Sequence, residues 1–284
     1  MEGGTVTLLA IESATDTVGV ALIRADGGSA ERVHEGGRAH AELLAPAIEE
    51  VCALSGGTVA DVDQLAVDTG PGLFTGLRVG VATAKALAQA LGICVLGVSS
   101  LDVLAAAAAE RFEPGRAVRV VSVVDARRGE VFAASYRFDE AVGPAGDDPF
   151  LDEPFADDPF VDPRSVCDDR LEPIGPDTLV NWLADLGKEA GRVTVVGDGA
   201  VRYRQLLSAD PSVDLGSAEE LSAPSPLVLA GLARRRLAAG DRPVPPGVLL
   251  PDYRRPADAR INWEQRAPRI EKTAASPDGR GQLR

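Results

Sequence analysis

The chain has 284 residues, 45% of them hydrophobic, and its formal net charge at pH 7 is −14. This length and this apolar content predict a globular protein with one large or two modest domains. A net charge of −14 would ordinarily argue against a nucleic-acid-binding surface, but residues 139–172 carry −10 of it, so the remaining mildly acidic part neither demands nor excludes nucleic-acid binding. Three cysteines without a C-x-x-C pair indicate neither a disulfide framework nor a thiolate metal site.

The first predicted elements are strands. Two β-rich runs at residues 5–12 and 17–24, and a third at 31–35 after a glycine turn, predict a β-meander that opens a sheet. No basic segment followed by a long apolar run opens the chain, and the apolar run at 103–109 is far too short to span a bilayer. We therefore expect a cytoplasmic protein without membrane contact.

An amphipathic helix is predicted at residues 42–54, with apolar side chains on adjoining faces and three glutamates opposite. Pro46 must lie in about the first turn of this helix, because further inside it would remove a helical hydrogen bond. Gly56 and Gly57 are expected to end the helix.

Residues 64–100 predict a strand, a tight glycine loop, a helix at 77–91 and a second strand. Three polar side chains of this helix, Arg78, Lys85 and Gln89, recur at helical spacing and so lie on one narrow stripe. The rest of the helix surface is apolar or small, which is typical of a helix that is buried over most of its circumference. Two explanations remain open: burial by the chain's own sheet and a neighbouring helix, or burial by a partner subunit.

The glycine loop suggests a phosphate site, because a glycine turn that opens a helix presents free N–H groups to an anion. Its pattern, G-x-G-x-x-x-G, is one residue too long for the dinucleotide fingerprint, and no Walker lysine follows the last glycine. A tight turn capped by Thr75 is the favoured interpretation. The tentative loop or nucleotide-facing residues are Gly70, Gly72, Thr75, Gly76 and Arg78.

An alanine-rich helix is predicted next at residues 101–112, and then a hairpin at 117–138 with Arg127 and Arg128 at its tip. These arginines either contact a phosphate or an acidic partner, or are solvated turn residues. Residues 139–173 differ in kind, because the motifs DDPF, DEPF and DDPF recur every five residues in a strongly acidic stretch. This composition predicts a disordered or extended acidic insert.

The last part of the chain predicts helices at 178–186, 200–207 and 227–239 and a strand at 192–196. Asp198, between two glycines, could face a nucleotide in a cleft, but a turn aspartate is the commoner explanation. The polar residues from 257 on are expected to form a flexible tail.

Four motifs, in order and spacing along residues 6–256, point to one family. They are LLAIESATDTVGVALI near the start, GPGLFTGLRVGVATAKALA followed by VSSLDVLA, VDARRGEVFAASY in the middle and LLPDYRRP near the end. Together they resemble the TsaB family, the dimerisation subunits of the bacterial machinery that makes N6-threonylcarbamoyladenosine (t6A) in tRNA.

The resemblance implies a two-lobed actin-like (ribonuclease H-like) α/β fold with mixed sheets flanked by helices, a shortened paralogue of the catalytic subunit TsaD. We expect an N-terminal lobe at 1–110 with partner-binding helices, a C-terminal lobe at 111–256 with the acidic insert at about 139–173, and a flexible tail at 257–284. The resemblance also implies a non-catalytic subunit. Such a subunit binds and activates the TsaD-like enzyme for threonylcarbamoyl transfer to adenosine 37 of tRNAs that read ANN codons.

By this resemblance, two helices of the first lobe form the interface with the TsaD-like subunit. No intrinsic cofactor or metal is expected, and ATP or ADP and metal are expected on partner subunits. Expected partners are the TsaD-like subunit in a heterodimer, a TsaE-like ATPase, and tRNA indirectly through the complex, with a homodimer as an option for the chain alone. The expected interface residues are Leu43, Leu44, Ala47, Ile48, Val51, Leu77, Val81, Ala84, Leu87 and Ala88.

The alternative is an actin-like ATPase or small-molecule kinase that acts on its own. Such an enzyme needs a phosphate-binding cleft, but Glu12 stands where actin-like ATPases usually have Asp, and the first turn lacks glycines. A metalloenzyme is also disfavoured. The only histidines, His34 and His40, are six residues apart across a Gly-Gly break and cannot share a helix face, so each is expected to be a surface or capping residue.

Overall fold

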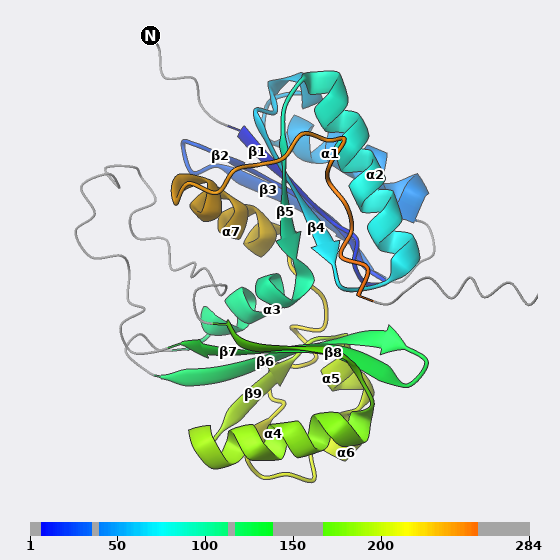
Figure 1. The fold of residues 1–284 in the computed structure, drawn as a ribbon. Coiled ribbons are helices and arrows are strands. Elements are labelled where there is room, and N and C mark those ends of the chain that lie inside the picture. The colour runs from blue at the N-terminus through cyan, green and yellow to red at the C-terminus, as the bar shows by residue number, and fades with distance from the viewer. Residues whose placement is uncertain (1–6, 36–39, 113–116, 139–166, 255–284) are drawn as a thin grey trace, which may run out of the picture. The chain divides into compact units, whose positions relative to one another are not determined.

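The structure is a computed structural model that describes residues 7–35, 40–112, 117–138 and 167–254. These residues form two five-stranded mixed sheets flanked by helices, which confirms the predicted α/β class (Figure 1). The first sheet has the order β3-β2-β1-β4-β5 and the second β10-β9-β6-β7-β8. The strands are β1 (Thr7–Glu12), β2 (Val18–Arg24), β3 (Ser29–His34), β4 (Gln64–Gly70), β5 (Val95–Ser99), β6 (Val118–Arg127), β7 (Glu130–Phe138), β8 (Cys167–Ile174), β9 (Val193–Val196) and β10 (Val213–Asp214).

The helices follow the predicted order closely. Most differences are shifts of a few residues at the ends, where the first and last turns carry the weakest apolar pattern. The helices are α1 (His40–Leu54), α2 (Phe74–Leu91), α3 (Ser100–Ala109), α4 (Pro176–Ala190), α5 (Asp198–Arg202), α6 (Arg204–Leu207) and α7 (Pro226–Ala238), with a short 3₁₀ turn at Val59–Asp61. No helix of the described ranges is long and apolar enough to cross a membrane.

The first sheet begins with the predicted meander, in which β1, β2 and β3 pair antiparallel, and continues with β4 and β5 parallel to β1. Helices α1 and α2 cover one face of this sheet (Figure 1). Pro46 lies in the second turn of α1 and not in the first as predicted, because the helix begins earlier, at His40. Its missing N–H therefore costs α1 one hydrogen bond.

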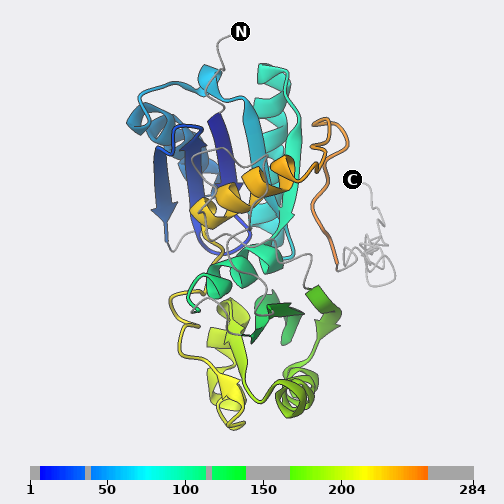
Figure 2. The ribbon, with the colours of Figure 1, turned by 90° about the vertical axis from the view of Figure 1, so that its left-hand side faces the viewer.

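The other face of the first sheet packs on α3 and α7, which share one apolar cluster with β6 and β7 of the second sheet. Helix α7 comes late in the chain, yet it contacts β1 and β2; in Figure 2 this golden helix crosses the blue strands. A Cβ on Gly19 would lie 2.8 Å from Cγ of Pro226, so this glycine permits the close approach. The division into two lobes at residue 110 stays a prediction.

The second sheet is built on the predicted hairpin of β6 and β7, and α4 packs on its outer face. Strand β8 pairs with β7, so residues 167–173 are not part of an extended insert as predicted. Alternation of apolar and polar side chains is weak in this strand, which is why its sequence resembles the acidic stretch before it. The rest of the predicted insert, residues 139–166, and the predicted tail, residues 257–284, lie outside the described residues.

Residues 244–254, here called the C-terminal strap, run along the edge of the first sheet. Val244 pairs with Val95 of the edge strand β5, and the Asp252 N–H donates to the Thr69 carbonyl at 2.7 Å. Leu249 is buried in the cluster under α1 and α2. The strap thus covers a strand edge that would otherwise expose unpaired backbone groups.

Candidate partner-binding surface

The glycines before and inside α2 allow the loop after β1 to pack directly on this helix. A Cβ on Gly72 would lie 2.2 Å from the Ala14 carbonyl oxygen, and one on Gly76 would lie 2.0 Å from the Ser13 carbonyl oxygen. The Leu73 N–H donates to the Ala14 carbonyl at 2.6 Å. The space at the start of α2, where a phosphate would bind, is therefore filled by the backbone of residues 13 and 14.

Thr75 does not cap this turn as predicted. The N-cap of α2 is Leu73, without a side-chain cap hydrogen bond, and Thr75 is already an exposed residue of the first helical turn. The helix starts three residues earlier than its apolar pattern suggested. The free N–H at its start is satisfied by Ala14 from another loop, which local sequence cannot reveal.

Two carboxyl groups lie side by side at the carboxyl ends of β1 and β4. Glu12 and Asp68 are both fully buried, and each keeps one oxygen without a hydrogen-bond partner. Burial raises the pKa of Glu12 well above its ordinary value, and the neighbouring Asp68 raises it further. Burial also raises the pKa of Asp68, although Ser100 and the Gly70 N–H donate to it. Burial and the neighbouring carboxyl group therefore favour the protonated form of Glu12.

The predicted hairpin arginine Arg127 takes part in ion pairs within the chain. Its guanidinium lies 3.1 Å from Asp125 and 3.1 Å from Asp16 of the loop after β1. Arg202 shares the Asp125 carboxylate at 3.2 Å. Asp198 accepts from the Asp125 N–H at 2.8 Å, and burial raises the pKa of Asp198 to about 6. The Arg127–Asp16 ion pair joins the hairpin tip to the loop of the first sheet, whereas the turn aspartate Asp198 contacts the hairpin strand of its own sheet.

Of the two histidines, His34 is half-buried at the end of β3, and His40 is buried and not at the surface as predicted. His40 is buried at the start of α1, and its Nε2–H donates to the Thr15 carbonyl at 2.9 Å. In the described ranges, no three His, Cys, Asp or Glu side chains are grouped closely enough to hold a metal ion.

Most of the side chains expected at the partner interface lie in the chain's own core. Eight of them are buried between the first sheet and its two covering helices, and two, Leu43 and Leu87, are half-buried. Their contact with a partner stays a prediction. The helical apolar period identified the faces that pack on the sheet, because both a core face and an interface face are apolar. The eight buried residues are Leu44, Ala47, Ile48, Val51, Leu77, Val81, Ala84 and Ala88.

The outward face of α2 is small, whereas that of α1 is acidic as well as small. Helix α2 presents alanines at successive turns, at positions 82, 86 and 90, and α1 presents Ala45 and Pro46 together with three exposed glutamates at positions 42, 49 and 50. Short side chains let another helix approach to about 8–10 Å between axes. These outward faces, here called the helix-pair face, are the candidate surface for a partner. In the sequence, the alanines at helical spacing indicate this face, because they are not required by the packing of the core.

The polar stripe of α2 holds the C-terminal strap. The Lys85 ammonium donates to the Leu249 carbonyl at 3.1 Å, and Arg78 Nε donates to the Tyr253 hydroxyl at 3.2 Å. These contacts explain two of the three polar positions on an otherwise apolar helix. Arg78 therefore borders the strap and does not point into a nucleotide cleft.

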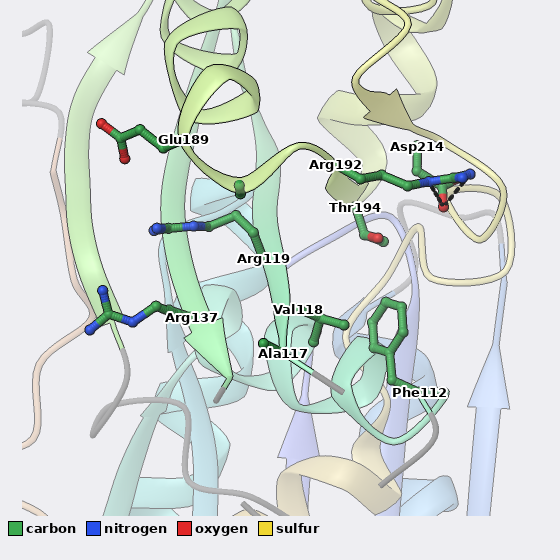
Figure 3. A pocket seen from close by; sticks show the side chains of 10 residues that line it. Phe112, Ala117, Val118, Arg119, Arg137, Glu189, Arg192, Thr194 and Asp214 are labelled. Atoms are coloured by element: carbon green, nitrogen blue, oxygen red, sulfur yellow. Dashed lines mark hydrogen bonds and ion pairs between the residues drawn. The ribbon is translucent and has the colours of Figure 1, made fainter. Parts of the chain in front are cut away.

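A cavity of about 670 Å³ opens at the amino ends of β6 and β9. Figure 3 shows Arg119 and Arg137 side by side in it, with Arg192 paired to Asp214 across the opening. Arg119 and Arg137 are both ion-paired to Asp168 of β8. The arginines of this cavity are thus compensated within the chain, which leaves little net charge for a ligand.

Comparison with known proteins yields one consistent set of relatives. The chain is 32% identical over 199 residues to the tRNA threonylcarbamoyladenosine biosynthesis protein TsaB of Escherichia coli strain K12, covering 68% of this chain and 80% of that protein. It is 29% identical over 262 residues to the protein of the same name from Bacillus subtilis strain 168, covering 90% and 97%.

The solved structures agree with these relatives. A crystal structure of an uncharacterized Pseudomonas aeruginosa protein with similarity to peptidase YeaZ superposes with a TM-score of 0.67 at 27% identity, covering 88% of this chain and 100% of that one. The family described as TsaD, tRNA N6-adenosine threonylcarbamoyltransferase, matches residues 31–150. That segment includes α1, α2 and the hairpin of β6 and β7.

Proposed function

The chain belongs to the TsaB family of tRNA threonylcarbamoyladenosine biosynthesis proteins, with the actin-like fold of that family, and we propose that it is the non-catalytic partner of a TsaD-like subunit. In this role it binds the TsaD-like enzyme through the helix-pair face. It stabilises the enzyme in the form that transfers the threonylcarbamoyl group to adenosine 37 of tRNAs that read ANN codons. ATP or ADP and metal bind to the partner subunits, which include a TsaE-like ATPase.

One observation carries the proposal: α2 presents small side chains outward beside the small and acidic outward face of α1, and the same segment matches the TsaD family. The partner should therefore carry its own version of α1 and α2. Two related helix pairs can dock face to face about a pseudo-twofold axis, as identical surfaces do in a homodimer. The same geometry makes a homodimer available when the TsaD-like subunit is absent.

The packing of the glycine loop supports a role without nucleotide chemistry. Backbone atoms of residues 13 and 14 fill the start of α2, and Glu12 is buried beside Asp68, where burial and the neighbouring acid raise its pKa. An ATPase of this fold needs phosphate at that turn and an ionised acid beside it. In this chain the turn is filled by backbone atoms and the acid is buried in the packed interior.

The experiment is a calorimetric titration of the purified chain with the TsaD-like subunit of the same organism. Ala82→Glu places a charge on the exposed face of α2 and should weaken binding by about tenfold or more while the thermal melt stays unchanged. Asn181→Glu, an exposed position on α4, is the matched control and should bind like wild type. Equal binding by both variants would remove the helix-pair face from the interface.

A parallel titration with ATP alone tests the independent enzyme. No heat with ATP and tight binding of the TsaD-like subunit would support the partner role. Binding of ATP without the partner, followed by turnover, would favour an ATPase or kinase that acts on its own.

A further inference from the structure

Two aromatic rings and one arginine gather where the C-terminal strap meets the first turn of α2. Phe74 and Tyr253 are 43% and 45% exposed, with ring centroids 5.2 Å apart. The guanidinium carbon of Arg78 lies 3.8 Å from the centroid of the Phe74 ring, and its Nε donates to the Tyr253 hydroxyl. In the described ranges, no carboxylate lies within ion-pair distance of Arg78. This guanidinium is held in place with its two terminal NH₂ groups available.

Exposed apolar side chains concentrate in the same region. Seven large hydrophobic residues of the described part are exposed, and four of them belong to the strap or to the first turn of α2. Exposed apolar groups scattered singly need no explanation, whereas a concentration of them marks an interaction site. The strap patch is defined here as Phe74, Arg78, Val248, Leu250 and Tyr253.

We propose that the strap patch is a second contact site for the TsaD-like subunit, where a carboxylate of the partner pairs with Arg78 and apolar side chains cover the two rings. The inference rests on the proposed function, because it names a further part of the same interface. Arg and Tyr are the residue types that most often dominate binding energy. A guanidinium fixed against a ring can bind a carboxylate through two parallel hydrogen bonds with little loss of side-chain freedom.

The position and size of the helix-pair face favour this extension. Arg78 and Ala82 lie on successive turns of α2, so the strap patch continues the outward face of that helix. Helices α1 and α2 are each about 10 Å wide, and α2, the longer one, is about 27 Å long. Their outward faces together cover roughly 500 Å². A stable specific interface buries about 800 Å² per partner, so contacts beyond the two helices are expected.

A protein partner fits the patch better than RNA does. Bases can stack on exposed rings, but RNA binding also needs clustered cations along the backbone. Near the patch, Lys85 is bound to the Leu249 carbonyl and Arg254 to Asp252, and the whole chain carries a net charge of −14. Among the described residues near the patch, Arg78 is the cation without a carboxylate or carbonyl partner, and such a cation between apolar groups matches a carboxylate on an apolar protein surface.

The test is a calorimetric titration of the TsaD-like subunit with wild type, Arg78→Ala and Arg78→Lys. Arg78→Ala should raise the dissociation constant by about tenfold or more, and Arg78→Lys should recover only part of the loss, because an ammonium cannot make the paired contact. Arg192→Ala, an exposed arginine at the far end of the second sheet, is the control and should stay within about twofold of wild type. Thermal melts should be the same for all variants.

Each other result overturns the proposal in a different way. Wild-type binding with Arg78→Ala within about twofold of wild type removes the strap patch and leaves the proposed function intact. No binding by wild type removes both. If Arg78→Ala instead weakens self-association in sedimentation, or retention of tRNA on filters, with the TsaD-like subunit bound normally, the patch serves a second copy or RNA and not this partner.

Discussion

Asp102 is the position where one substitution should cost the most stability. Asp102 is a buried residue in the first turn of α3, and its carboxylate pairs with three side chains from three other elements. Arg236 of α7 donates to it at 2.8 Å, the Tyr136 hydroxyl of β7 donates at 2.9 Å, and Arg170 of β8 pairs with it as well. Because α7 packs on the first sheet and β7 and β8 belong to the second, this one carboxylate joins the two sheets.

The expected loss follows from the burial of Arg236. Both Arg236 and Asp102 have side chains that are only 2% exposed, so Asp102→Ala removes one counter-charge from a cation that water cannot reach. Removing one partner of a buried ion pair costs about 3–5 kcal/mol. At about 2–4 °C per kcal/mol for a chain of this size, the melting temperature should fall by roughly 6–20 °C. Asp102→Asn keeps an acceptor for Tyr136 and should lose somewhat less.

Urea unfolding followed by circular dichroism measures the effect. Asp185→Ala breaks an exposed ion pair with Lys188 and should leave the unfolding midpoint unchanged. The double variant Asp102→Ala/Arg236→Leu removes both charges and should recover part of the loss, because an apolar pair can replace a buried ion pair at little cost. A loss below about 1 kcal/mol for Asp102→Ala, or no recovery in the double variant, would refute the reasoning from buried charge.

Two further substitutions test the packing of the glycine loop and the buried acids. Gly76→Ala would place a Cβ 2.0 Å from the Ser13 carbonyl oxygen and should destabilise the fold by about 3 kcal/mol or more in thermal melts, whereas Gly247→Ala, with open space around it, should change stability by less than about 0.5 kcal/mol. Because the pKa of Glu12 is raised in the fold, the folded chain keeps a proton that the unfolded chain releases above about pH 4. The contribution of Glu12 to the free energy of unfolding is therefore full below that pH and declines as the pH rises toward the folded pKa. Glu12→Gln does not titrate, so its unfolding free energy relative to wild type should improve from pH 5 to pH 8; an unchanged difference would show that the acid is ionised in the fold.

The sequence predicted the elements better than it predicted their partners. Short β-rich runs located the meander and the hairpin, most of whose strands are buried on both faces, and the helical period located α1 and α2, which bury one face and expose the other. The same reasoning could not tell a core face from an interface face. Val81 and Ala84 point into the sheet and Ala82 and Ala86 point outward, and all four are apolar. Only the position of the sheet decides which pair is free for a partner.

Contacts between distant segments account for the other differences. Thr75 is a good capping residue, but the start of α2 is satisfied by Ala14, which lies about sixty residues earlier in the chain. Helix α7 follows the second sheet in sequence, yet its place is on the first, where Gly19 gives Pro226 room. The sequence around Ala14 or Gly19 does not indicate which distant segment each residue contacts. Loop closure over such distances costs little additional entropy, so the chain can use remote segments wherever their shapes fit.

The glycine motif is compatible with two different structures, a phosphate-binding loop and a tightly packed loop. Glycines before a helix let a backbone or a phosphate approach equally closely, since either needs the room that a Cβ would occupy. In this chain the loop after β1 occupies the room beside the glycines, and Glu12 at the end of that strand is buried against Asp68. A site filled in this way gives rigidity to α2 from its first turn. A rigid helix favours partner binding by the helix-pair face and the adjoining strap. Each side chain or loop that became ordered only on binding would reduce the binding free energy.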